Sequence, residues 1–303
     1  MSATPQRRSQ TNGSRSMVTA PLRENNVLGL MAGGGAMPRM VVENARKAGQ
    51  QVVVLGLRGF ADPELASIAD KFYWCGVGRM GRAIRLFLRE GAYRMILAGS
   101  VKKSDMYGRF RLFRLLPDLT TMRFWFFHLP DKRTDSILGK LAEMLEARGI
   151  LMENCVKYLM DSMAKEGVLT RSQPSASQMR DIEFGWPVAK EMGRLDIGQS
   201  IAVKEQDVIA VEAIEGTDRM IVRAGELCRA GGWTLIKVSK PNQDMRFDVP
   251  TVGPDTIENL KTHGAKALVI EADKTFVVDY EAMVERAEKY GIVVVAHRND
   301  DCE

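Results

Sequence analysis

Short apolar runs alternate with segments of helical spacing along the first half of this chain. The clearest run is Gln51–Leu57, which is rich in valine and leucine. Val27–Ala32 precedes it and Arg94–Ala98 follows it, and each of these two runs ends at glycines. Strands of a parallel sheet are buried on both faces and have this near-continuous apolar character, with helices connecting them. The pattern therefore predicts a Rossmann-like α/β domain with a parallel sheet.

The second half of the chain also alternates between predicted strands and helices. Trp233–Val238 and residues 266–270 read as strands, and residues 255–263 and 280–290 have helical spacing. A length of 303 residues favours two domains. We therefore predict a tail over residues 1–24, a Rossmann-like domain over 25–165 and a second α/β domain over 166–303.

The first 24 residues are polar and basic. They carry four arginines against one glutamate, so the net charge of +5 for the whole chain leaves only +2 for the remainder. Because few large apolar side chains occur here, we interpret this segment as a disordered tail. The small charge of the remainder argues against a nucleic-acid-binding surface.

Cysteine usage and hydropathy point to the cytoplasm. The tail has no apolar segment of the kind found in signal peptides, and no uninterrupted apolar run is long enough for a membrane span. The four cysteines are widely spaced without a C-x-x-C pair, so neither a zinc site nor a disulfide framework is predicted. We expect any metal to be a hard cation bound by carboxylates.

Gly33, Gly34 and Gly35 separate a predicted strand from a predicted helix. Backbone N–H groups at such a turn, together with the helix dipole, can hold a phosphate. The dinucleotide-binding fingerprint is incomplete because Pro38 takes the place of its third glycine. Arg58 leaves open an NADP-dependent oxidoreductase in which this arginine binds the extra phosphate. A purely structural glycine turn is the other alternative.

The segment Lys237–Gly253 directly follows a predicted buried strand and holds two lysines, one arginine, two aspartates and two prolines. Lysine and arginine bind phosphate oxygens, and an aspartate can bind Mg²⁺ or orient a water molecule. Loops at strand ends often carry such groups. A solvated, charged turn explains the segment equally well, and the segment alone does not distinguish Asp244 from Asp248.

A second polar loop, Glu215-Gly216-Thr217-Asp218, lies upstream. Thr217 has the position of an N-cap, whose side-chain oxygen accepts a bond from a first-turn N–H, and this explains the residue without a ligand. Alternatively, Glu215 and Asp218 bind a metal or orient a water molecule. Still further upstream, Gln199 is a candidate for binding a base or a sugar.

Residues 102–128 are rich in both cationic and aromatic side chains, most densely at Phe124-Trp125-Phe126-Phe127. A cationic, aromatic surface is typical of contact with a membrane interface or an acyl chain. An amphipathic helix that packs on the sheet explains the same composition, and we favour this second interpretation.

Seven short motifs, taken in order, give the chain a specific resemblance. They resemble the LpxI family of UDP-2,3-diacylglucosamine pyrophosphatases and span nearly the whole chain apart from the tail, which argues against chance similarity. The motifs are A-G-G-G-A-M-P (32–38), L-R-G-F-A-D-P (57–63), A-G-S-V (98–101), G-R-L-D-I-G-Q (193–199), A-I-E-G-T-D-R-M (213–220), K-V-S-K-P (237–241) and R-F-D-V-P-T-V-G (246–253).

The resemblance implies an enzyme whose two α/β domains hold the lipid product between them, so that the active site lies in the interdomain cleft. It implies Mg²⁺-dependent hydrolysis of the pyrophosphate of UDP-2,3-diacylglucosamine to UMP and lipid X, the diacyl sugar phosphate, as a step of lipid A biosynthesis. Attack on the sugar-side phosphorus is suggested. Asp248 corresponds to the family's catalytic aspartate, which favours it over Asp244.

The other site residues follow from the same resemblance. Lys237 joins Asp248 as a catalytic residue, and the lysines neutralise charge that builds on the leaving oxygen. Asp248 and Asp218 are the expected metal ligands. The expected substrate-binding residues are Gly35, Ala36, Ser100, Val101, Gln199, Thr217, Lys240 and Arg246.

The substrate implied by the resemblance is an amphiphile. We therefore expect peripheral contact with the inner membrane, through residues 110–127. A homodimer is compatible with these expectations, and nucleic acid is not an expected partner. Two rival classes remain open: the NADP-dependent oxidoreductase, and a non-catalytic protein that binds nucleotide sugars or lipids without releasing UMP.

Overall fold

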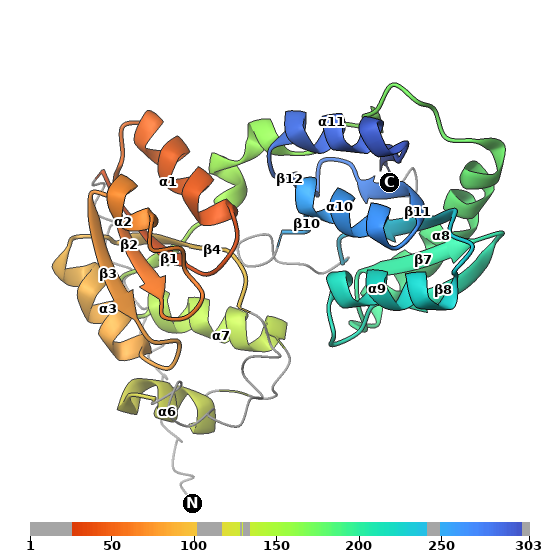
Figure 1. The fold of residues 1–303 in the computed structure, drawn as a ribbon. Helices are drawn as coiled ribbons and strands as arrows, with labels where there is room; N and C mark the ends of the chain where they lie inside the picture. Colours follow the sequence, from red (N-terminus) through yellow and green to blue (C-terminus); the bar gives the residue numbers. More distant parts are fainter. Residues whose placement is uncertain (1–25, 102–116, 128, 130–133, 241–248, 299–303) are drawn as a thin grey trace, which may run out of the picture.

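The computed structural model describes residues 26–101, 117–127, 129, 134–240 and 249–298. The predicted tail, the cationic residues 102–116 and the predicted site residues Arg246 and Asp248 lie outside the described residues. The described chain forms two α/β lobes, an N-terminal one on the left of Figure 1 and a C-terminal one on the right. The prediction of two α/β domains is confirmed.

The described part of the N-terminal lobe contains a five-stranded parallel sheet in the order β3-β2-β1-β4-β5. Its strands are apolar because helices cover both faces. Leu28 and Leu30 pack under α1 and α2, whereas Val53 and Leu55 pack under α3 and α7. The elements are β1 (Val27–Ala32), α1 (Met37–Lys47), β2 (Gln51–Leu57), α2 (Leu65–Ile68), β3 (Lys71–Cys75), α3 (Met80–Arg89), β4 (Arg94–Ala98), α6 (Leu119–Phe127), α7 (Thr134–Glu146) and β5 (Leu151–Met152).

The strand order reverses beside β1, which lies between β2 and β4. In doubly wound sheets, ligands bind outside the carboxyl ends of the strands at such a reversal. The loop after β1 carries Gly33–Gly35, and the loop after β4 carries Gly99–Val101. The topology therefore brings two of the predicted substrate-binding segments to the same edge of the sheet.

The described part of the C-terminal lobe contains a six-stranded mixed sheet in the order β6-β13-β11-β9-β7-β8. Its central strands are parallel, whereas β6, β7 and β8 run antiparallel to their neighbours. Helix α8 covers one face, and α9, α10 and α11 cover the other. The elements are β6 (Gly167–Val168), α8 (Ala176–Arg194), β7 (Ser200–Lys204), β8 (Asp207–Val211), α9 (Thr217–Leu227), β9 (Trp233–Lys237), β10 (Thr251–Val252), α10 (Pro254–Thr262), β11 (Ala265–Glu271), β12 (Phe276–Val277), α11 (Tyr280–Tyr290) and β13 (Val293–His297).

The lobes share an apolar cluster. Val249 and Phe276 of the C-terminal lobe pack with Tyr158 and Leu159, which follow β5, and Met163 forms a β-bridge with Phe276. Val249 is also the residue after Asp248 in the sequence. One end of the predicted catalytic loop is therefore anchored where the two lobes meet.

Candidate functional site

The two glycine loops of the N-terminal lobe are bonded to each other. Gly34 and Ser100 exchange two backbone hydrogen bonds of 2.9 Å, and the N–H of Gly33 donates to Ala98 at 2.8 Å. A Cβ atom at Gly33 would lie 2.7 Å from the Ser100 carbonyl oxygen, and one at Gly99 would lie 2.6 Å from the Gly34 oxygen. The close approach of the loops thus accounts for two of these glycines without a ligand.

Gly35 differs from its neighbours. Its φ of 91° suits glycine, yet a Cβ atom there would meet nothing within 4 Å. Gly35, Ala36 and Ser100 are exposed, and Val101 is half-buried. Because α1 starts directly after Ala36, its first-turn N–H groups point toward this open edge. The fold places all four predicted substrate-binding residues of this lobe together, at a position suited to an anion.

In the C-terminal lobe, the start of β7 lies beside the end of β9. Ser200 pairs with Lys237 in the antiparallel register, and the N–H of Val238 donates to the Gln199 carbonyl oxygen at 2.9 Å. The hydroxyl oxygens of Ser200 and Thr217 are 3.3 Å apart. The predicted residues Gln199, Thr217 and Lys237 therefore gather at one edge of the second sheet, although they come from three different motifs.

Thr217 is not an N-cap, so that interpretation was wrong. The N-cap of α9 is Gly216, with a φ of 84°, and Thr217 is the first helical residue. Its hydroxyl donates to Oε2 of Glu212 at 3.0 Å, and Glu212 is only 7 % exposed. The donated proton leaves the lone pairs of Thr217 to accept from Ser200 or from a ligand. Glu212 is a site residue that the sequence interpretation missed.

Gln199 has a side-chain oxygen that is buried without a hydrogen-bond partner among the described residues. A buried amide oxygen left in this state costs free energy, so such atoms normally have a partner in the functional complex. A donor on a bound ligand would remove that cost. This observation supports the prediction that Gln199 binds substrate.

Lys237 is almost fully buried, with 7 % exposure, and its ammonium group donates to the Thr251 carbonyl oxygen at 2.9 Å. This bond ties the start of the segment 237–251 to its end. Lys240, at the start of the same segment, forms an ion pair with Asp196 of the G-R-L-D-I-G-Q motif. Arg246 and Asp248 lie between these anchors but outside the described residues, so their roles stay predictions.

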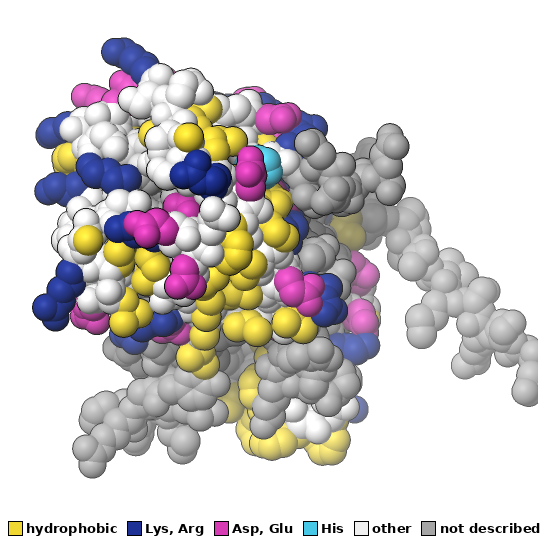
Figure 2. Space-filling model, turned by 90° about the vertical axis from the view of Figure 1, so that its right-hand side faces the viewer, with side chains coloured by type: hydrophobic (Ala, Val, Ile, Leu, Met, Phe, Trp, Pro, Cys, Tyr) yellow, Lys and Arg dark blue, Asp and Glu magenta, His cyan; other side chains and the backbone are white. Residues whose placement is uncertain are grey.

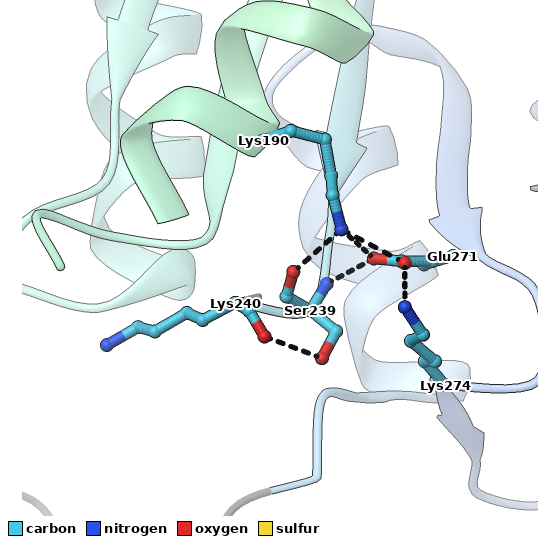
Figure 3. Close-up of polar contacts among 5 residues, drawn as sticks. All are labelled: Lys190, Ser239, Lys240, Glu271 and Lys274. Atoms are coloured by element: carbon cyan, nitrogen blue, oxygen red, sulfur yellow. Dashed lines mark hydrogen bonds and ion pairs between the residues drawn. The ribbon is translucent and has the colours of Figure 1, made fainter. Parts of the chain in front are cut away.

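Glu271, the last residue of β11, is bonded to the same segment (Figure 3). Its buried carboxylate accepts from the backbone N–H of Ser239 at 2.7 Å, from Lys190 at 3.0 Å and from Lys274 at 2.8 Å. Lys190 also donates to the carbonyl oxygen of Ser239 at 3.1 Å. The sequence interpretation missed this cluster because its members lie up to 81 positions apart along the chain.

The acidic residues near α9 bear on the predicted metal site. Asp218 is exposed in the first turn of α9, whereas the carboxylate of Glu215 pairs with Arg223 at 2.6 Å. A bond from its own backbone N–H and the Arg223 pair hold the pKa of Glu215 below its usual value. Asp218 is therefore the carboxylate of this loop that remains suited to a cation. Within the described ranges, no three acidic, histidine or cysteine side chains lie together as a metal site.

Taken together, the fold and these edges define a two-domain α/β protein with groups suited to an anion on both lobes. The comparison with known families makes this more specific. The LpxI N-terminal domain matches residues 27–162 and the LpxI C-terminal domain matches residues 165–295. The chain belongs to the LpxI family, as its motifs predicted, and this membership favours a hydrolase over the oxidoreductase that the glycine loop left open.

One curated relative is the UDP-2,3-diacylglucosamine pyrophosphatase LpxI of Caulobacter vibrioides. It is 34 % identical over 283 residues, which cover 88 % of this chain and 96 % of the relative. A biotin carboxylase domain of 2-oxoglutarate carboxylase from Hydrogenobacter thermophilus is a solved structure with 15 % identity and a TM-score of 0.25, covering 67 % of this chain and 41 % of that one. That likeness is too low to support an argument.

Proposed function

We propose that this protein hydrolyses the pyrophosphate of UDP-2,3-diacylglucosamine to UMP and 2,3-diacylglucosamine 1-phosphate, a step of lipid A biosynthesis. The curated relative, similar over nearly its full length, carries this activity in its name. The observation that supports it most is the gathering of Gln199, Thr217 and Lys237 at one sheet edge. This edge combines a buried cation for phosphate oxygens with polar groups for the rest of a nucleotide.

The residues divide the work according to their chemistry. Lys237 and Lys240 neutralise the diphosphate, where negative charge builds on the leaving oxygen. Gln199 and Thr217 hold the substrate on the same lobe, while the open loop edge at Gly35, Ala36, Ser100 and Val101 binds it on the other. Asp248 orients the attacking water, assisted by Arg246. With these groups on both lobes, the substrate occupies the space between them.

Magnesium is part of the proposal. Asp248 and the exposed Asp218 would supply the oxygen donors that Mg²⁺ prefers. Bound there, the ion would polarise the phosphoryl group and lower the pKa of a water molecule. Removal of the ion with a chelator is expected to stop turnover, and its return is expected to restore it.

We also propose peripheral contact with a membrane through α6. No helix in the described part of the chain has the length and hydropathy to cross a membrane. However, α6 packs against α3 and buries only Phe124 well, leaving Leu119, Phe126 and Phe127 more than 70 % exposed. Hydrophobic side chains gather at the lower end of the molecule in Figure 2, at the level of α6 in Figure 1. A cytoplasmic location and a homodimer stay predictions.

The test is to incubate the protein with UDP-2,3-diacylglucosamine and Mg²⁺ in ¹⁸O-labelled water. We expect UMP and a 2,3-diacylglucosamine 1-phosphate that carries the label, because attack is expected at the sugar-side phosphorus. Tight substrate binding without UMP release under any divalent metal would overturn the proposal in favour of a binding protein.

A further inference from the structure

The backbone of Ser239 is held on both sides by a buried ion pair. Its N–H donates to Glu271 and its carbonyl oxygen accepts from Lys190 (Figure 3). The two groups belong to the successive peptide units on either side of the Ser239 Cα atom, so a change in φ or ψ of Ser239 would break at least one of these bonds. Since Lys240 comes next in the chain and Lys237 two positions earlier, this pair fixes the direction in which the segment leaves β9.

The charges around Glu271 are unequal. Two lysines, Lys190 and Lys274, pair with one carboxylate, which leaves an excess positive charge next to Ser239. Glu271 itself is 2 % exposed, whereas Lys274 is about half exposed. The carboxylate of Glu271 therefore holds two ammonium groups close to the loop but neutralises only one of their two positive charges.

Stability alone does not account for a cluster of this kind. Burial by itself raises the pKa of the Glu271 carboxyl, but the bonds from Lys274, the Ser239 N–H and Lys190 outweigh burial and leave that pKa below its usual value. Buried ion pairs contribute little net stability compared with apolar residues of the same volume. What the cluster does provide is one orientation of the two peptide groups that flank the Ser239 Cα atom.

We propose that Glu271 is a positioning residue for the hydrolysis, which sets the start of the loop after β9 and with it the backbone direction at Lys240. It acts through the Ser239 backbone and Lys190, without touching the substrate. The other end of the loop is fixed independently, by Lys237 on Thr251 and by Val249 in the cluster between the lobes. The inference rests on the proposed function, because it concerns the same loop.

The test compares steady-state kinetics of UMP release by the full chain. Glu271→Gln keeps the size of the side chain but removes the charge and one acceptor oxygen. We expect kcat to fall roughly 10- to 100-fold, as small misplacements of reacting groups do. KM is expected to change less than about 3-fold, because Gln199 and Thr217 are untouched. Lys190→Met breaks the other bond to the Ser239 backbone and is expected to give the same split between kcat and KM.

Glu90→Gln is the matched control. Glu90 is also a carboxylate with little exposure, 8 %, and it accepts from Lys71, Arg89 and Tyr73. It lies at the end of α3 in the N-terminal lobe, away from the loop. Loss of this second cluster is expected to change stability but to leave kcat within about 2-fold of the wild type.

The outcomes distinguish failure of the proposed function from failure of the positioning role of Glu271. If the wild type releases no UMP, the proposed function fails and the inference fails with it. If the wild type is active and Glu271→Gln retains its kcat, the inference alone is wrong. It is also wrong if Glu90→Gln lowers kcat as much as Glu271→Gln, because the effect is then general loss of stability.

Discussion

At the scale of single residues, the buried oxygen of Gln199 makes a specific demand on the ligand. Because this atom has no partner within the described part of the chain, a donor of the substrate is expected to satisfy it. Gln199→Met keeps the length of the side chain and removes the acceptor. KM is expected to rise roughly 10-fold with little change in kcat, since the bond serves ground state and transition state alike.

Gln50→Met provides the control for this substitution. Gln50 accepts a hydrogen bond from the Tyr158 hydroxyl at 3.0 Å in the N-terminal lobe, so its amide oxygen already has a partner. Its replacement is expected to leave KM unchanged. An unchanged KM in Gln199→Met as well would contradict the assignment of Gln199 to substrate binding.

The sequence predicts correctly which of these residues lie close together, but it does not predict the hydrogen bonds that they form. Gln199, Thr217 and Lys237 lie together because each is at or near the end of a strand whose apolar pattern is clear. The partner of Thr217 depends instead on how the chain turns from β8 into α9, and Gly216 takes the cap position there. Glu271 had no local signal, since its partners come from α8, from the segment after β9 and from the turn after β11.

At the scale of elements, the contact between the loops after β1 and β4 makes Gly99 hard to replace. Its φ is 88°, and a Cβ atom would lie 2.6 Å from the Gly34 oxygen. Gly99→Ala is expected to destabilise the protein by about 2 kcal/mol or more, from backbone strain and the clash together. Urea unfolding measures the change.

Gly49→Ala separates the two causes. Gly49 has a similar φ of 78°, but nothing lies within 4 Å of the Cβ position. Only backbone strain acts there, so a loss of about 1 kcal/mol is expected. Equal losses for the two substitutions would show that the loops are not in the contact described.

Helix α6 carries a prediction of its own. Phe126 and Phe127 are 71 % and 82 % exposed, and their replacement together by serine is expected to weaken sedimentation with anionic vesicles roughly 10-fold or more. The control replaces Met160 and Leu227, exposed by 64 % and 63 % elsewhere on the surface, in the same way. Undiminished binding of the α6 variant would contradict membrane contact through this helix.

Elements with strong apolar periodicity could be predicted with accurate bounds. The predicted ranges Val27–Ala32, Gln51–Leu57 and Arg94–Ala98 are those of β1, β2 and β4. In contrast, β3 (Lys71–Cys75) escaped prediction because it is a half-exposed edge strand with one charged and three aromatic residues. The prediction of a helix that packs on the sheet also differs from the structure. Helix α6 contacts α3, and much of its apolar surface is exposed.

At the scale of the whole molecule, the segment 238–250 connects the interior of the second sheet with the junction of the lobes. It starts at the Ser239 peptide held by Glu271 and ends at Val249, which packs against residues of the N-terminal lobe. Lys237 also bonds across its two ends. The two described ends of this segment therefore depend on contacts with both lobes, and such contacts follow from the topology and could not be predicted from local sequence patterns.

The most direct test of the account is the rate of UMP release from UDP-2,3-diacylglucosamine and Mg²⁺ by two variants of this loop. Asp248→Ala is expected to lose activity roughly 1,000-fold while still binding substrate, because it removes the group that activates water. Asp244→Ala, four residues earlier in the same loop, is expected to stay within about 3-fold of the wild type. Wild-type activity in Asp248→Ala would contradict the proposed site, and no UMP release by the wild type would contradict the proposed function.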